Sequence, residues 1–561
     1  MAAVTWRSFG FSGAGAATGP ATCGQKGLWL DIAAKEHETA FFNPSKEIEV
    51  PAGLSVDDLL ADLRTLVVRH RSLRTVLYRD ATGALTQEVL AGGEIEVPLV
   101  RIGDGAEALW DAVAEHRRRA ERRPFDLAAE PPIRPAIFLS GEKPLAVLLC
   151  TAHTAADGTG VGNLAADYGR LLAARTGGDG ALPAARQPLE QALYERSALG
   201  RRRLSKALRH WRTVLETAPR TMFPSEPEGP PRHHAGTLYS RAAAMALDAA
   251  ARRLSVSSST VLLAATAAAL GRHTGMPRCP VQLISANRFA DPEVNAVACM
   301  IQGTPAVVDL DRPLFRDVVD GAWEASIRAL RHGVYDRERL PGIVSSVQRR
   351  RGVHLDLSCY FNDMRARTAP DPARAAIGAD VLAQAAGESR FRVEDAVEQE
   401  KFALYAENAS TYDDETDELV ELVRLTVHAD ARFVGSGELR ALLFGIERLL
   451  VQAACREVRM DEIEQITGIS PPVRGPRWVL HEGCWVDLDA VERMVRQAVD
   501  ATAVRAGMER APDGTEEIVA RIRPAAGGLT AEDVRAACLR MLPGLQTAVL
   551  PRRFVLEGGA A

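Results

Sequence analysis

The most constraining feature of the sequence is an apolar strand that stops at a histidine and is followed directly by a helix. Residues 144–152 have the length and apolar composition of a buried strand. His153-Thr-Ala-Ala-Asp157-Gly158 comes next, and from Gly160 to Ala174 apolar residues recur at helical spacing. We therefore expect a strand, a loop and a helix, an arrangement in which a rigid scaffold commonly presents reactive groups.

Length and composition indicate a multidomain globular protein. A chain of 561 residues suggests two to four units of roughly 100 to 200 residues each. The net charge of -5 gives no reason to expect nucleic acid or an anionic membrane as partner. The longest apolar windows, 260–270 and 145–150, are shorter than the roughly 18 to 20 residues that cross a bilayer. With no secretion signal at the N-terminus, we expect a cytoplasmic protein.

Cysteines and histidines give no sign of a metal or a bound cofactor. The eight cysteines are scattered singly, which favours reduced, mostly buried thiols. His233 and His234 are adjacent, so their side chains diverge on a strand, and no third ligand is close in sequence. We expect no metal site and no bound cofactor.

The pattern of elements predicts an α/β protein in three parts. A turn-rich stretch begins at Thr176 and a proline-rich break spans 471–476, so we expect domains at 1–180, 181–468 and 477–561. The periodicities predict helices near 55–74, 106–119, 188–216, 245–271, 314–332 and 437–457, and strands at 75–78, 85–90, 280–286, 354–361 and 419–429. The last part reads as a small α+β unit.

The loop after residue 152 contains groups suited to acid–base chemistry. Neutral imidazole accepts a proton near pH 7. An acidic residue four positions after His153 can hold the loop that orients the ring. By itself this short pattern is weak, because a single histidine at a strand end is more often structural.

Further motifs occur in a fixed order along the chain. They are Thr22-Cys-Gly-Gln25-Lys-Gly-Leu28-Trp29, Arg69-His70-Arg-Ser-Leu73-Arg74-Thr75, Pro124-Phe125-Asp126-Leu127 with Pro132-Ile-Arg134, Ala286-Asn-Arg288-Phe, and the segment from Val297 to Leu310. Together with the histidine loop, these motifs resemble the condensation domains of nonribosomal peptide synthetases. The resemblance is collinear over residues 20–465 and extends to the wider superfamily of chloramphenicol acetyltransferase.

This resemblance implies a fold and a reaction. The expected fold is two chloramphenicol-acetyltransferase-like lobes in a V-shaped pseudo-dimer, with a substrate tunnel between them. The expected reaction is attack of an amine or hydroxyl on an acyl thioester carried by the phosphopantetheine of a carrier protein. The acceptor is a small-molecule nucleophile or a second carrier protein. His153 accepts the nucleophile's proton or aligns the nucleophile, and the sequence does not separate these roles.

The resemblance also assigns roles to other residues. Asp157 is expected to be structural and to pair with Arg288. Gly158 is expected to make room for the substrate and to donate its amide to the developing oxyanion. Asn362 aligns with a polar tunnel position of some relatives.

One residue departs from the family pattern. Most peptide-forming members have two adjacent histidines, whereas here the first position is Ala152. Amide and ester formation therefore both stay as alternatives. So do a coenzyme A-dependent O- or N-acyltransferase and a non-catalytic recruitment module.

The C-terminal part of the chain and three basic runs have further expected roles. Residues 477–561 resemble the small subdomain of an adenylation domain without the segment that holds its lysine, so we expect no ATP use and a docking or structural role. No phosphopantetheine attachment motif is present, so carrier proteins are expected to be supplied in trans. The basic runs at 116–123, 201–212 and 349–351 are either solvated helix faces or docking patches for an acidic partner.

Overall fold

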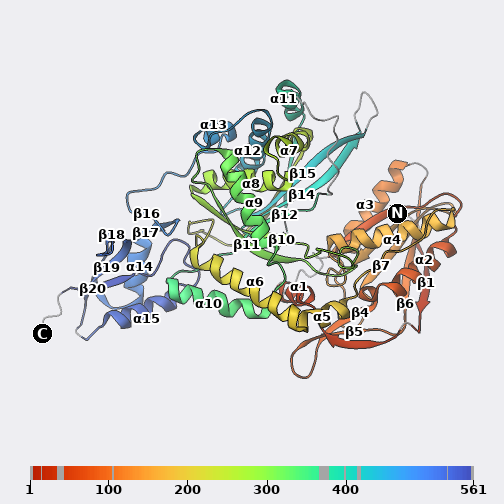
Figure 1. Ribbon diagram of the computed structural model, residues 1–561, viewed down its shortest axis with the longest axis horizontal. Helices are drawn as coiled ribbons and strands as arrows, with labels where there is room; N and C mark the ends of the chain where they lie inside the picture. Colours follow the sequence, from red (N-terminus) through yellow and green to blue (C-terminus); the bar gives the residue numbers. More distant parts are fainter. Residues whose placement is uncertain are drawn as a thin grey trace. The chain divides into compact units, whose positions relative to one another are not determined.

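The chain forms two compact units in the computed structural model (Figure 1). The structure describes residues 4–13, 15–34, 43–103, 106–365, 378–396, 400–412, 419–526 and 528–557. The first unit comprises Met1–Ala207, Ser285–Gln302 and Gly333–Arg339, and the second comprises Leu208–Ile284, Gly303–His332 and Leu340–Ala561. Arg288 therefore belongs to the same unit as His153, although the two are far apart in sequence.

A five-stranded sheet forms the centre of the first unit, in the order β1-β6-β7-β8-β3. Val147 and Leu148 are neighbours on β8, so they lie on opposite faces. Val147 packs in a core with helices α2 and α4, whereas Leu148 packs on the side of α3. The elements are β1 (Val4–Phe11), β3 (Ser45–Glu49), α2 (Val56–Arg69), β6 (Gly93–Ile102), α3 (Ala106–Arg122), β7 (Ile133–Ser140), β8 (Lys143–Thr151) and α4 (Gly158–Arg175).

A smaller sheet, β2-β5-β4, and two short helical elements accompany it. The elements are β2 (Ala17–Pro20), α1 (Cys23–Ala34), β4 (Thr75–Arg79), β5 (Leu85–Val89) and α5 (Pro188–Arg196). The predicted helix near residue 55 is confirmed as α2. It begins with a capping box in which the backbone N–H of Asp58 donates to Ser55 and the N–H of Ser55 donates to the Asp58 carboxylate. The predicted hairpin is confirmed as β4 and β5.

The second unit is built on a seven-stranded sheet in the order β11-β10-β12-β14-β15-β9-β13. One continuous apolar core joins the sheet to helices α7, α8, α9 and α12. The elements are β9 (His233–Ser240), β10 (Arg278–Ser285), β11 (Gln302–Asp309), α9 (Phe315–Leu330), α10 (Leu340–Arg351), β12 (Cys359–Asp363), α11 (Ala379–Gly387), β13 (Arg390–Asp395), β14 (Phe402–Tyr412), β15 (Leu419–Asp430), α12 (Ser436–Cys455) and α13 (Ile463–Thr467). The predicted α/β class is confirmed.

Two of the predicted helices are wrong in extent, because each is interrupted by serine caps. The segment 188–216 divides into α5 and α6 (Ala198–Thr217), and Ser197 accepts a hydrogen bond from the backbone N–H of Gly200. The segment 245–271 divides into α7 (Arg241–Leu254) and α8 (Ser258–Thr274). Ser255 closes α7 with a positive φ of 58°, and Ser257 caps α8. The strand predicted at 354–361 begins only at Cys359.

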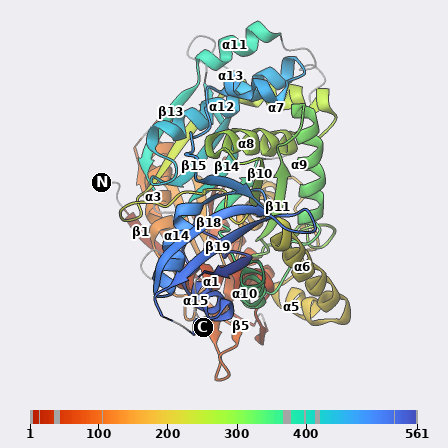
Figure 2. The same ribbon diagram turned by 90° about the vertical axis from the view of Figure 1, so that its left-hand side faces the viewer.

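The C-terminal part of the second unit is a small α+β arrangement (Figure 2). It contains the hairpin β16-β17 and the three-stranded sheet β18-β19-β20, contacted by α14 and α15. The elements are β16 (Trp478–His481), β17 (Cys484–Asp487), α14 (Leu488–Ala498), β18 (Ala501–Arg510), β19 (Glu516–Pro524), α15 (Ala531–Met541) and β20 (Arg553–Leu556).

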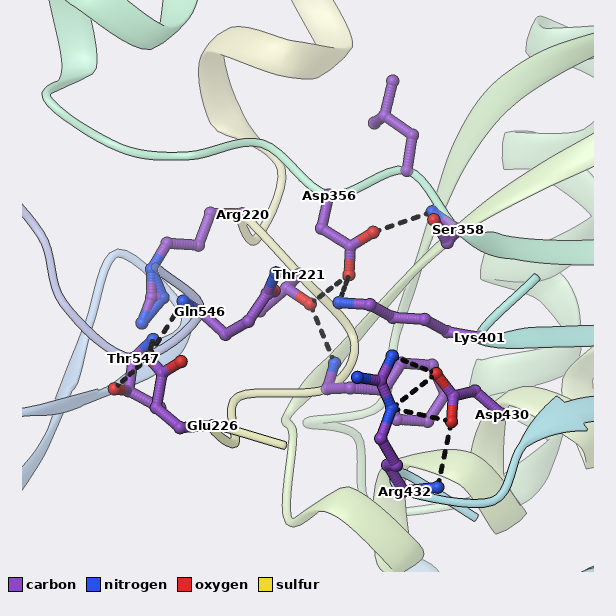
Figure 3. Close-up of polar contacts among 12 residues, drawn as sticks. Arg220, Thr221, Glu226, Asp356, Ser358, Lys401, Asp430, Arg432, Gln546 and Thr547 are labelled. Atoms are coloured by element: carbon purple, nitrogen blue, oxygen red, sulfur yellow. Dashed lines mark hydrogen bonds and ion pairs between the residues drawn. The ribbon is translucent and has the colours of Figure 1, made fainter. Parts of the chain in front are cut away.

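Polar contacts attach this C-terminal part to the rest of the second unit (Figure 3). One carboxylate oxygen of Glu226 accepts from the backbone N–H of Gln546 at 3.0 Å and of Thr547 at 2.9 Å, and from the Thr547 hydroxyl at 2.7 Å. Arg220, which is buried, donates to the carbonyl of Trp485 at 2.8 Å. Cys484 is part of the large apolar core of the unit.

Among the described residues, no single helix is long and apolar enough to cross a membrane. Helices α7 and α8, which meet at a bend of 104°, satisfy that test only as a pair and only by length and composition.

Candidate active site

The loop that carries His153 is a compact turn between β8 and α4. The backbone N–H groups of Ala155 and Ala156 both donate to the carbonyl of Ala152, at 2.9 and 3.2 Å. The side chain of Ala152 is only 1% exposed and packs with Phe125 and Cys150. Position 152 therefore belongs to the core, and its side chain is not part of the surface around His153.

The imidazole of His153 has a lowered pKa, which favours its neutral form. Burial lowers the pKa of its imidazole from the ordinary value of 6.5, while the nearby Asp157 carboxylate and the backbone of His153 itself oppose this shift. The lowering by burial is the larger effect. With a pKa below 6.5 the neutral imidazole predominates at pH 7, and this is the form that accepts a proton from a nucleophile.

Asp157 contacts four other residues of the first unit through one carboxylate. One oxygen accepts from the N–H of Gly160 at 2.8 Å and so caps α4. The other accepts from the N–H of Met300 at 2.8 Å and of Ile301 at 3.2 Å. Both oxygens contact the guanidinium of Arg288, each at 2.9 Å. A carboxylate with all its lone pairs engaged and 0% exposure is a structural group rather than a proton carrier.

Arg288 completes this cluster, and the structure brings it together with Asp157. Its side chain is 3% exposed. Besides the carboxylate, its guanidinium donates to the carbonyl of Ala298 at 2.8 Å and of Ala286 at 3.1 Å. The bidentate pair therefore ties segment 286–301 to the N-terminus of α4, directly beside the His153 loop.

The two glycines at the start of α4 have different roles. At Gly158, a Cβ would have no described atom within 4 Å, and the residue is exposed. At Gly160, a Cβ would lie 2.9 Å from the carbonyl oxygen and 3.1 Å from the nitrogen of Ala298. Packing therefore requires glycine at 160, whereas Gly158 leaves open space next to a helix N-terminus, whose first N–H groups have no intrahelical acceptor.

Sequence reasoning missed Gly160 and the backbone of residues 298–301. The only signal in the sequence is a second glycine two residues after Gly158. The contact partner lies more than a hundred residues away, so spacing alone does not reveal it.

Asn362, the fifth predicted residue, lies on β12 of the second unit. It is partly buried and pairs in register with Tyr405 of β14. The first unit by itself contains His153, Asp157, Gly158 and Arg288.

Several residues of the other motifs are structural. His70 is buried, and its Nε2 lies 3.0 Å from a carboxylate oxygen of Asp167. Arg74, also buried, donates to the carbonyl of Leu90 at 2.6 Å. Arg134 stacks over the ring of Phe125 at 3.7 Å. These motif residues stabilise the first unit around the candidate site.

His234 is engaged in the structure of the second unit. Its Nε2 donates to the carbonyl of Val434 at 2.7 Å, and its Nδ1 lies 3.1 Å from the hydroxyl of Ser436. Within the described part of the chain, no group of three or more metal-ligating side chains is found.

The chain is similar to known proteins of one family. The family model named Condensation domain matches residues 16–413. A probable non-canonical nonribosomal peptide synthetase, CymA of Salinispora arenicola, is 28% identical over 328 residues, which are 56% of this chain and 4% of that protein. This chain therefore spans only a small part of that relative's length.

Two solved structures resemble the chain in fold. The complex of the X-domain and OxyB from teicoplanin biosynthesis matches with a TM-score of 0.55 and 21% identity, over 79% of this chain and 95% of that chain. A condensation domain that mediates chain release from the enacyloxin polyketide synthase matches with a TM-score of 0.57 and 18% identity, over 77% and 83%. At these identities the similarity concerns the fold, which in condensation domains has two chloramphenicol-acetyltransferase-like lobes.

Proposed function

This chain belongs to the condensation-domain family, and we propose that it transfers an acyl or aminoacyl group from a carrier-protein thioester to an amine or hydroxyl nucleophile in natural-product biosynthesis. The carrier protein that presents the thioester lies outside the 561 residues. The observation that carries the proposal is a histidine with a lowered pKa, held on a loop that the Asp157–Arg288 pair fixes.

In the proposed mechanism, His153 accepts the proton of the nucleophile as nitrogen or oxygen attacks the thioester carbonyl. The tetrahedral intermediate carries negative charge on oxygen, and the amide of Gly158 at the N-terminus of α4 donates to it. Collapse breaks the carbon–sulfur bond, and the imidazolium returns its proton to the departing phosphopantetheine thiolate. Asp157 takes no part in proton transfer and keeps the loop in place.

Amide and ester products stay as alternatives within this proposal. Since the side chain of Ala152 lies in the core, the missing first histidine removes no group from around the reacting atoms.

Asn362 is proposed as a polar contact for the substrate. The proposed division at 1–180, 181–468 and 477–561 assigns the chemistry to the first two parts.

We propose that residues 477–561 do not adenylate and instead complete the second unit. The contacts of Glu226 and Arg220 with this part support a structural role. No ATP is consumed in the proposed reaction.

The test supplies two donors to the purified protein with a panel of amines and alcohols. One donor is an acylated carrier protein and the other is the same acyl group on coenzyme A, with products followed by mass spectrometry. We expect the unmodified protein to turn over the carrier-bound donor and His153→Ala to lose this activity. Turnover with coenzyme A alone would establish the coenzyme A-dependent acyltransferase instead. Product formation by His153→Ala equal to that of the unmodified protein would exclude His153 as the catalytic residue. No product above a protein-free control would favour the non-catalytic recruitment module.

A further inference from the structure

The three basic runs of the chain differ in how their charge is used. In the run on α3, Arg117 pairs with Glu47, and Arg118 and Arg119 both pair with Glu115. These pairs neutralise much of the positive charge of that helix. The α3 run is therefore salt-bridged at Arg117, Arg118 and Arg119, whereas Arg122 and Arg123 are exposed and have no ion pair within the described residues.

In the run at the end of α10, two of the three arginines are paired. Arg350 pairs with Glu216, and Arg351 pairs with Glu482. Arg351 also donates to the carbonyls of Leu215 and Ala218. These arginines hold parts of the second unit together and are not available as a cationic surface.

The run at the start of α6 combines solvent-facing cations with exposed apolar side chains. Arg202 and Lys206 are exposed, and no ion pair of either is found within the described residues. Residues 199, 202, 203 and 206 have helical spacing that places them on one face of α6. Leu199, on that face, is 63% exposed.

An exposed aromatic ring extends this face. Phe289 is 51% exposed, and the guanidinium of Arg203 lies 5.0 Å from the centre of its ring. We name the surface formed by Leu199, Arg202, Arg203, Lys206 and Phe289 the α6 patch. Exposed leucine and phenylalanine side chains with flanking cations are typical of a protein-binding surface.

The α6 patch is firmly connected to the His153 loop. Phe289 directly follows Arg288, whose guanidinium holds Asp157. The segment after Phe289 is itself attached to the chain that precedes α5, because the N–H of Arg186 donates to the carbonyl of Pro292 at 3.2 Å. A partner bound here therefore contacts the same segment that anchors the active-site loop.

We propose that the α6 patch binds an acidic, partly apolar surface of the carrier protein that delivers the thioester. This inference rests on the proposed function and names the docking surface for its partner. Arg202 and Lys206 provide attraction to carboxylates, while Leu199 and Phe289 provide apolar contact. Asp291 is exposed two residues after Phe289, which disfavours a polyphosphate such as RNA at this surface.

The experiment compares a double charge reversal in the patch with a matched one elsewhere. The patch variant is Arg202→Glu with Lys206→Glu, and the control is Arg122→Glu with Arg123→Glu on exposed positions at the end of α3. Both change the net charge by the same amount. A third variant, Phe289→Ala, removes the apolar contact without changing the charge.

Binding is measured by fluorescence anisotropy with peptidyl carrier proteins of the source organism that carry a fluorescent phosphopantetheine, and with the fluorescent phosphopantetheine alone. For the patch variant we expect Kd to rise at least roughly tenfold for the carrier protein and to stay unchanged for the free arm. Phe289→Ala should also raise Kd, with an effect that persists at high salt. The control should bind like the unmodified protein.

The possible outcomes separate this inference from the proposed function. If the patch variant and the control bind the carrier protein equally well, or if the patch binds RNA or anionic vesicles in preference to it, the docking inference is wrong. Turnover assays with acyl-carrier and acyl-pantetheine donors test the function separately. A protein that binds carrier proteins through the patch but transfers no acyl group contradicts the proposed function and leaves the docking surface established.

Discussion

At the scale of single residues, the site depends on a division of roles between two ionisable groups. Burial lowers the pKa of His153, so the ring is a base at neutral pH. Asp157 has every acceptor position engaged by Arg288 and three backbone N–H groups. The histidine can therefore change its protonation state while the carboxylate holds its surroundings constant.

The pH dependence of the reaction follows from this arrangement. In the proposed mechanism the neutral imidazole is the active form and protonation removes it, so kcat/KM should fall as the pH is lowered through the pKa of His153. Because that pKa lies below 6.5, the midpoint of this decline should lie below pH 6.5. A pH–rate profile of the acyl transfer measures the midpoint. A midpoint at or above 6.5 would contradict the role of burial.

Replacing Asp157 tests its structural role. Asp157→Asn leaves the guanidinium of Arg288 buried without its counter-charge, which should cost about 3 to 5 kcal/mol of unfolding free energy. Denaturant unfolding measures this loss. The double variant Asp157→Asn with Arg288→Met should lose less than the sum of the two single variants, because the pair is removed together. If the losses simply add, the two residues do not act as a pair.

At the scale of elements, the first turn of α4 contains both residues required for packing and residues of the candidate site. Asp157 caps the helix, Gly160 allows the backbone of Ala298 to approach, and Gly158 leaves space at the first turn. The same turn therefore contains a glycine that the fold requires and one that it does not.

A matched pair of substitutions separates these glycines. In Gly160→Ala the new methyl group meets the rigid backbone of Ala298 at 2.9 Å, so the protein should be destabilised by about 1 to 3 kcal/mol. Gly158→Ala meets no described atom and should retain the stability of the parent protein. Its turnover should nevertheless fall, since the methyl group occupies space proposed for the substrate. Thermal unfolding and kcat/KM are the two measurements, and full activity in Gly158→Ala would exclude a substrate next to that residue.

At the scale of the whole molecule, the C-terminal part is attached to the second unit by contacts of different kinds. Cys484 enters the apolar core, Arg220 reaches the carbonyl of Trp485, and Glu226 accepts three hydrogen bonds from Gln546 and Thr547 (Figure 3). Beside this contact, Asp356 accepts from Lys401 and Thr221. Burial by itself raises the pKa of Asp356, but these donors outweigh it and the pKa is lowered.

Removing the Glu226 carboxylate should loosen the end of the chain locally. In Glu226→Ala the donors of Gln546 and Thr547 lose their acceptor, so amide hydrogen exchange around residues 545–550 should become faster. Unfolding free energy should fall by about 1 kcal/mol, because the site is partly exposed. Glu228→Ala, a neighbouring exposed carboxylate, is the control. Unchanged exchange in Glu226→Ala would show that the apolar contacts alone hold this part.

Apolar periodicity and motif order in the sequence predicted most helices and strands and pointed to the loop at His153. Apolar periodicity is local, so β8, the loop at His153 and α4 followed from residues 144–174, and the order of the motifs indicated the family. Sequence patterns failed where the capping serines Ser197, Ser255 and Ser257 interrupt two apparently continuous helices. A serine cap competes with the helix through a local hydrogen bond that periodicity does not register.

Contacts between remote segments of the chain bring the residues of the candidate site together. They place the backbone of residues 298–301 against Asp157 and Gly160, and they bury Ala152 in the core. Within the described residues, Arg202 and Lys206 of α6 have no carboxylate partner, whereas Arg117, Arg118 and Arg119 of α3 and Arg350 and Arg351 of α10 are paired. Each of these depends on chain segments that are remote in sequence and meet through packing. Burial and ion pairing are properties of such contacts, so no local pattern specifies them.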